Sequence, residues 1–182
     1  IAVGPDDAAM RIAPEWRGPP PPEAGVEIVS LRGCDVAPID LTDPEALLRL
    51  CAYAWPEHRV RAQRLEIAAA EAARHAPDLV EADAAAFVVA ALARPQATGT
   101  TSVLMHSIVW QYLGGERQAA ITAAMEAAGA KATPDRPLAW VAVEANRQTF
   151  RHELTVRHWP GGGEQHLLAG AHAHGAWVEW MA

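Results

Sequence analysis

The stretch TSVLMHSIVWQYL, residues 101–113, predicts a buried strand whose carboxyl end carries polar side chains. Its apolar run, VLM, is interrupted by His106 and Ser107, and a Gly-Gly turn pair at 114–115 follows soon after. Ligands of open α/β sheets bind outside the carboxyl ends of the strands. We therefore expect this strand to end at a ligand cleft.

The segments around this stretch alternate between strand and helix patterns, which is typical of an α/β sheet. The pattern HELTVRHW, residues 152–159, alternates and is followed by PGGG, so it predicts an antiparallel hairpin with residues 166–180. The expected fold is α/β, a Rossmann-like mixed sheet with helices on both faces and this C-terminal hairpin. Other strands are expected at 26–31, 79–84 and 137–145, an edge strand within 10–16, and helices at 44–55, 59–75, 84–93 and 116–128.

Composition bounds the class of protein. The 182 residues are 51% hydrophobic and 20% charged, which suits a globular domain over residues 26–182, preceded by a Pro-rich segment at 1–25. A net charge of −7 argues against a nucleic-acid partner. No run approaches the ~20 apolar residues of a membrane helix. Cys34 and Cys51 lack metal or disulfide spacing, which favours a cytoplasmic location.

Three strand ends resemble those of class I S-adenosylmethionine-dependent methyltransferases. GCDVAP, residues 33–38, is similar to the end of the second strand, which implies that Asp35 binds ribose hydroxyls. VEADA, residues 80–84, is similar to the third, which implies that Asp83 and Ala84 face the adenine. The stretch around His106 matches the fourth strand and its loop, which implies that Ser107 contacts the methyl donor.

The whole chain also resembles the C-terminal part of the DUF2332 family of uncharacterised bacterial proteins. That family carries a glycine-rich Gly-Ala-Ser-Ala-Gly segment upstream, and nothing comparable precedes Asp35. Because the chain begins with Ile1 and not Met, we expect that upstream sequence has been removed. The missing first strand is then supplied by the cleaved part or by a partner chain, or the fragment repacks without it. The resemblance is carried by EWRG (15–18), RGCDVAPIDLTDPE (32–45), AYAWPEHR (52–59), HSIVWQYL (106–113), PLAWVAVE (137–144) and HGAWVEW (174–180).

The candidate site residues each end a predicted strand. His106 is a candidate general base near neutral pH, with Glu144 as its carboxylate partner; the alternative is a histidine that only bonds backbone. Asp35 and Asp83 have the alternative roles of capping a turn and a helix. We expect these four residues along one edge of the sheet. No G-x-S-x-G elbow surrounds Ser107, which disfavours a Ser-His hydrolase.

Paired histidines near the C-terminus were weighed as metal ligands. His172 and His174 are two apart and would share one face of a strand, and His158 and His166 lie on the neighbouring hairpin. No cysteine or acidic ligand is adjacent, so we expect no metal.

Two functional hypotheses follow from these patterns. The first is an S-adenosylmethionine-dependent methyltransferase acting on an unknown small molecule, with Trp110 and Tyr112 lining its pocket. The second is a non-catalytic protein of the same fold that binds a small ligand or serves in assembly. The expected partners are a small molecule and either a second copy or the upstream part of the same protein.

Overall fold

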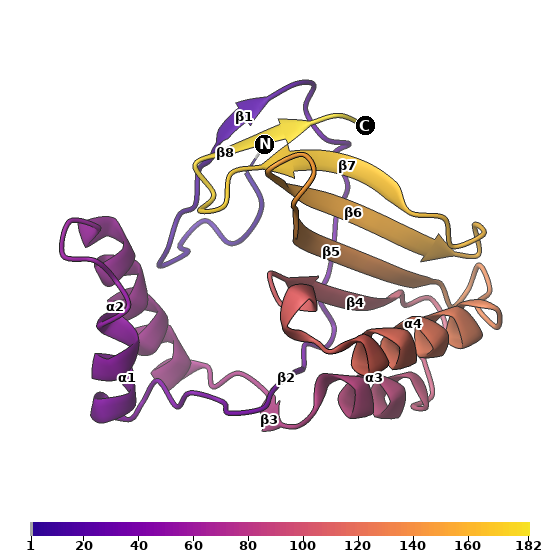
Figure 1. Cartoon of the computed structure of the whole chain (residues 1–182), viewed down its shortest axis with the longest axis horizontal. Coiled ribbons are helices and arrows are strands. Elements are labelled where there is room, and N and C mark those ends of the chain that lie inside the picture. The colour runs from indigo at the N-terminus through magenta and orange to yellow at the C-terminus, as the bar shows by residue number, and fades with distance from the viewer. Residues whose placement is uncertain (1) are drawn as a thin grey trace. The chain divides into compact units, whose positions relative to one another are not determined.

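The computed structural model describes residues 2–182, which divide into two compact units. Unit 1 comprises the residues up to 13 together with 24–83, and unit 2 comprises 14–23 together with 84–182. Figure 1 labels the helices and strands in chain order. The sequence-based boundary between residues 25 and 26 stays a prediction.

Unit 1 contains two helices and a small parallel sheet. The sheet pairs β2 (Gly33–Asp35) with β3 (Leu79–Glu81), and the helices are α1 (Pro44–Cys51) and α2 (Arg59–Arg74). The predicted start of α1 is confirmed, because the Asp43 side chain accepts a hydrogen bond of 3.0 Å from the Glu45 backbone N–H.

The predicted strand at residues 26–31 is wrong. These residues lie in irregular backbone, and the apolar Val26, Ile28 and Leu31 are exposed. An apolar run becomes a strand only where another strand supplies hydrogen bonds, and the ladder with β3 begins at Gly33. The sequence therefore located the element several residues too early.

Unit 2 is built on a six-stranded sheet. Its strands are β1 (Glu15–Arg17), β4 (Ser102–Ser107), β5 (Leu138–Asn146), β6 (Arg151–Trp159), β7 (His166–Ala171) and β8 (Trp177–Trp180). They lie in the order β1-β8-β7-β6-β5-β4. The outer pairs run parallel and the pairs between them antiparallel, so the predicted mixed sheet is confirmed.

The predicted C-terminal hairpin is confirmed for β6 and β7, which pair antiparallel. Its second arm differs from the expectation, because residues 166–180 form two strands and not one. A turn closed by the His172 N–H donating to the Trp177 carbonyl separates them, with Gly175 at a φ of 70°. Strand β8 then returns beside β7.

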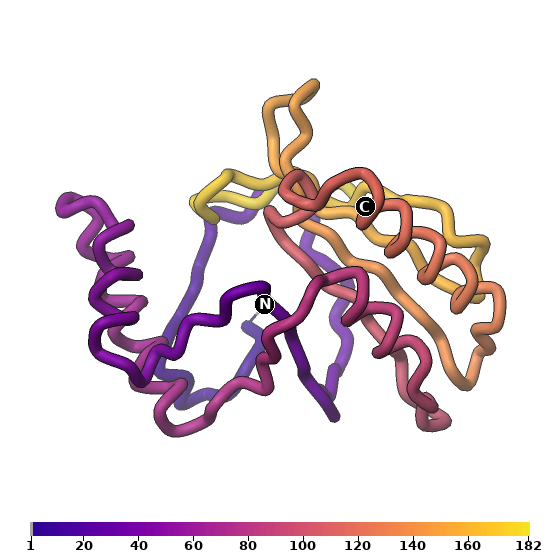
Figure 2. The backbone as a smooth tube through the Cα atoms, turned by 60° about the horizontal axis from the view of Figure 1, so that its bottom comes forward, coloured from indigo at the N-terminus to yellow at the C-terminus, as the bar shows by residue number. Residues whose placement is uncertain are grey.

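Helices α3 (Ala84–Leu92) and α4 (Gly115–Gly129) lie side by side, as Figures 1 and 2 show. Both contribute to one core with the sheet, so unit 2 carries its helices on one face and not on both. The buried residues of this core are Ala85, Val88, Ile121, Met125, Leu138, Trp140 and Trp159. None of the described helices is long and apolar enough to cross a membrane.

Within residues 101–113, β4 forms an edge strand with one half-buried face. Strand β4 is the last strand of the sheet order, and its residues alternate between half-buried and exposed. Leu104 and His106 lie on the half-buried face, whereas Val103 and Met105 are exposed. The apolar run VLM is therefore not a fully buried strand, because consecutive strand residues point to opposite faces.

Gly129 allows close packing between α4 and the sheet, and it is not a left-handed helix end. It lies inside α4, and the following Ala130 is right-handed helical. A Cβ atom on Gly129 would lie 2.5 Å from a ring carbon of Trp159. Helix α4 can therefore approach the sheet this closely only with glycine at this position.

We predict that Gly129→Ala lowers the free energy of unfolding by about 1–3 kcal/mol, because the added methyl overpacks the core against Trp159. Denaturant unfolding followed by tryptophan fluorescence measures the change. Gly115→Ala, in the same helix with no atom within 4 Å of its Cβ position, is the matched control. Equal stability of both variants would contradict the packing argument.

Candidate functional site

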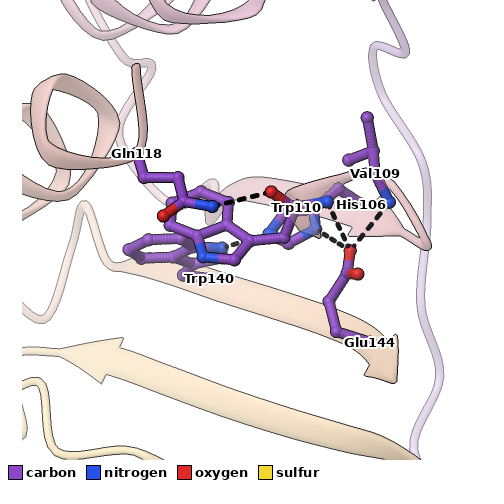
Figure 3. Close-up of polar contacts among 6 residues, drawn as sticks. All are labelled: His106, Val109, Trp110, Gln118, Trp140 and Glu144. Atoms are coloured by element: carbon purple, nitrogen blue, oxygen red, sulfur yellow. Dashed lines mark hydrogen bonds and ion pairs between the residues drawn. The ribbon is translucent and has the colours of Figure 1, made fainter. Parts of the chain in front are cut away.

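The candidate site lies where β4 ends beside β5. The two strands run parallel with His106 opposite Ala142, so Glu144, two residues further along β5, shares the face of His106. His106 Nδ1 and Glu144 Oε1 are 2.7 Å apart (Figure 3). The structure thus brings together the two residues that the sequence proposed as a pair.

The hydrogen bonds of His106 determine its tautomer. The indole Nε1–H of Trp140 can only donate, and it donates to His106 Nε2 over 2.9 Å. Nε2 therefore accepts with its lone pair, and the ring proton resides on Nδ1, from which it is donated to Glu144. A neutral His106 with both nitrogens engaged has no lone pair available to a substrate while these bonds persist.

The loop after β4 is also bound to Glu144. Its Oε1 accepts hydrogen bonds from the backbone N–H groups of Val109 (3.1 Å) and Trp110 (3.2 Å). Between these donors and the strand, Ile108 has a φ of 53°. A β-branched residue in this region is strained by on the order of 1–3 kcal/mol. The three bonds to one oxygen help to hold that conformation.

Aromatic rings pack against His106. The Trp110 ring stacks on His106 with centroids 5.4 Å apart, and it meets Trp140 edge-on at 5.3 Å. Gln118 of α4 donates to the Trp110 carbonyl over 2.8 Å, which ties the loop to the helix (Figure 3). Trp110 thus lies in the site as the sequence proposed.

A cavity of about 600 Å³ opens beside these residues. It is lined by His106, Trp110, Thr122, Trp140, Ala142, Glu144, Ala145, Asn146, Arg147, Gln148, Glu153, Thr155, Arg157 and Gln165. Ser107 and Tyr112 are exposed and do not line it. Tyr112 points elsewhere because residues 110–112 form a short 3-10 helix, which ends the strand alternation.

The contribution of β6 to this cavity was missed in the sequence. Glu153 lies directly opposite Glu144 in the β5–β6 register, and Thr155 and Arg157 follow on the same face. Alternation within HELTVRHW already placed these three residues together. Only the register with β5, set by the intervening turn, shows that they face the candidate site.

Asp35 and Asp83 both lie in unit 1. Asp35 is the last residue of β2, and Asp83 lies just after the end of β3. The Asp35 Oδ1 accepts a hydrogen bond from the Ala37 N–H over 2.8 Å, which is the turn-capping role weighed above. Ala84 begins α3. The expectation of a single sheet edge for all four strand ends is wrong, because β2–β3 and β4–β5 belong to different sheets.

The C-terminal histidines form pairs and no larger cluster. His158 stacks with His166 at 5.8 Å, and His172 lies 5.7 Å from His174. Within residues 2–182, no group of three or more His, Cys, Asp or Glu side chains is placed to hold a metal ion.

We predict that ¹⁵N NMR of the histidine side chains finds His106 protonated on Nδ1 and not on Nε2, because Trp140 donates to Nε2. Trp140→Phe removes that donor and should shift the tautomer population of His106. His158, whose ring contacts no tryptophan N–H, is the internal reference. A His106 signal with the proton on Nε2 in the unsubstituted protein would contradict the assignment.

Comparison with known proteins gives one match. The model of a family described as an uncharacterized protein conserved in bacteria, DUF2332, matches residues 1–180. No curated protein and no solved structure matches the chain. The match covers nearly the whole sequence, so the protein belongs to the DUF2332 family.

Proposed function

We propose that this protein binds a small polar molecule in the cavity of unit 2, with the Glu144 carboxylate as the group that contacts it. The supporting observation is the unequal use of its two oxygens. Oε1 accepts three hydrogen bonds, whereas Oε2 accepts none from residues 2–182. A carboxylate fixed by one oxygen, lining a cavity with the other unengaged, is preorganised to receive a ligand donor.

The walls of the cavity fit this proposal. Trp110 and Trp140 supply flat apolar surface, while Asn146, Thr155 and Gln165 supply a few polar groups. Small-molecule sites combine these two features. His106 acts here as a positioning residue, because its Nδ1–H orients Glu144 while Trp140 occupies its other nitrogen.

We predict that Glu144→Gln weakens ligand binding by roughly 10- to 150-fold, the loss of one charge-assisted hydrogen bond of ~1.5–3 kcal/mol. A metabolite panel screened by thermal shift and titrated by calorimetry provides the measurement. The glutamine keeps a carbonyl oxygen for the three donors, so the loop stays bound. Glu116→Gln, exposed on α4 outside the cavity, is the matched control. If both variants bind the ligand with equal affinity, Glu144 does not contact it.

Methyl transfer from S-adenosylmethionine is a second candidate, favoured by the parallel β2–β3 pair that carries Asp35 at its carboxyl end. One Asp35 oxygen caps the turn, which leaves the other for a ribose hydroxyl. The methionine end of the cofactor has no corresponding contact, because residues 1–34 contain no glycine-rich loop whose backbone could approach it. When bound, this cofactor would supply an electrophilic methyl group.

We predict that residues 1–182 do not bind S-adenosylmethionine appreciably, because Asp35 offers a contact to the ribose while no glycine-rich loop before it receives the methionine end. Calorimetric titration with S-adenosylmethionine measures this, with Asp35→Ala as the matched variant. Tight binding that Asp35→Ala weakens would show that a glycine loop is dispensable. Absence of binding would leave the non-catalytic ligand-binding function.

A further inference from the structure

The cavity wall carries two carboxylates side by side. Glu144 on β5 and Glu153 on β6 are direct partners in the antiparallel register, and both line the cavity. Side chains of directly opposed residues have Cβ atoms roughly 4.5–5.5 Å apart, and like charges in such pairs destabilise the sheet. A second group is therefore expected to offset this repulsion.

No cation among the partners of these carboxylates offsets it. Glu153 accepts from the neutral Asn146 Nδ2 (2.9 Å) and Thr149 Oγ1 (2.8 Å). Glu144 accepts from two backbone N–H groups and from His106 Nδ1, while His106 Nε2 accepts from the Trp140 indole N–H and so carries no proton in this arrangement. These donors solvate the charges without neutralising them.

The two arginines that line the cavity are directed elsewhere. Arg157 donates to the Gly163 carbonyl (2.6 Å) and to Glu126 (3.0 Å), and its guanidinium lies 5.5 Å from the Trp140 ring centroid. Arg147 stands in the exposed β5–β6 turn and forms no ion pair within residues 2–182. Neither pairs with the carboxylates of the wall.

We propose that the ligand of this cavity is an organic cation, with an ammonium or guanidinium group that Glu144 and Glu153 hold against the indole wall. The inference rests on the binding function proposed above and names its substrate class. Indole rings attract cations through their π faces, and Trp110 and Trp140 both line the cavity. A hard divalent metal prefers six or more oxygen ligands, more than these two carboxylates provide, and the cavity has the size of an organic ligand site.

The central comparison is between two ligands that differ only in charge. Choline and 3,3-dimethyl-1-butanol have the same shape, but a carbon replaces the quaternary nitrogen in the second. Agmatine and spermidine extend the test to guanidinium and primary ammonium groups, glucose and citrate represent neutral and anionic ligands, and Mg²⁺ and Ca²⁺ represent metals. Calorimetric titration of the full chain with each probe measures binding.

We predict that at least one organic cation binds, and that its neutral counterpart binds at least 10-fold more weakly. Glu153→Gln should weaken cation binding by about 10-fold or more, as should Glu144→Gln, while the exposed Glu116→Gln does not. Thermal unfolding of each variant verifies that the fold persists.

The remaining outcomes separate the two proposals. Suppose that glucose, citrate or the butanol binds, that Glu144→Gln weakens this binding, and that no organic cation binds. The proposal of a cationic ligand is then wrong, whereas the proposal of a small-molecule site at Glu144 is supported. If Mg²⁺ or Ca²⁺ binds more tightly than every organic probe, the proposal of an organic ligand is wrong. If nothing in the panel binds, both proposals fall.

Discussion

One carboxylate oxygen holds the candidate site together. Glu144 Oε1 receives donors from the end of β4 and from the loop that follows it, while its own backbone belongs to β5. Strand, loop and neighbouring strand therefore meet at a single atom. This contact helps to hold the strained Ile108 and the stacked Trp110, together with the Ile108 N–H, which donates to the Val143 carbonyl, and Gln118, which donates to the Trp110 carbonyl.

Much of the fold could be predicted from periodicity. Alternation in residues 152–159 identified β6, and the Asp43-Pro44 pair identified the start of α1. The pairing partners of the strands were harder to predict. The apolar run at 26–31 has the pattern of a strand, but no neighbouring strand forms hydrogen bonds with it. Which face of a sheet receives helices also depends on contacts distant in sequence, and these are not encoded in any local pattern.

The site was predictable where it follows from strand ends. His106 and Glu144 were paired because the carboxyl ends of parallel strands adjoin, and β4 and β5 are parallel. Glu153 was not found, because its position depends on the register of an antiparallel partner. The hydrogen bond from Trp140 to His106 could not be predicted either, since the two residues are 34 positions apart. While that bond persists, the Nε2 lone pair of His106 is engaged and cannot accept a proton from a substrate.

Strand β1 has a consequence for how the chain folds. It pairs with β8, so residues 15–17 find their partner only at 177–179, and Trp16 stacks on Trp180. Gly18 follows with a φ of 84°, and the Trp180 carbonyl oxygen lies against the position that a Cβ would take, so no side chain fits there. Contacts between such distant segments close large loops and slow folding. During synthesis on the ribosome, this edge of the sheet can form only after residues 177–179 have emerged.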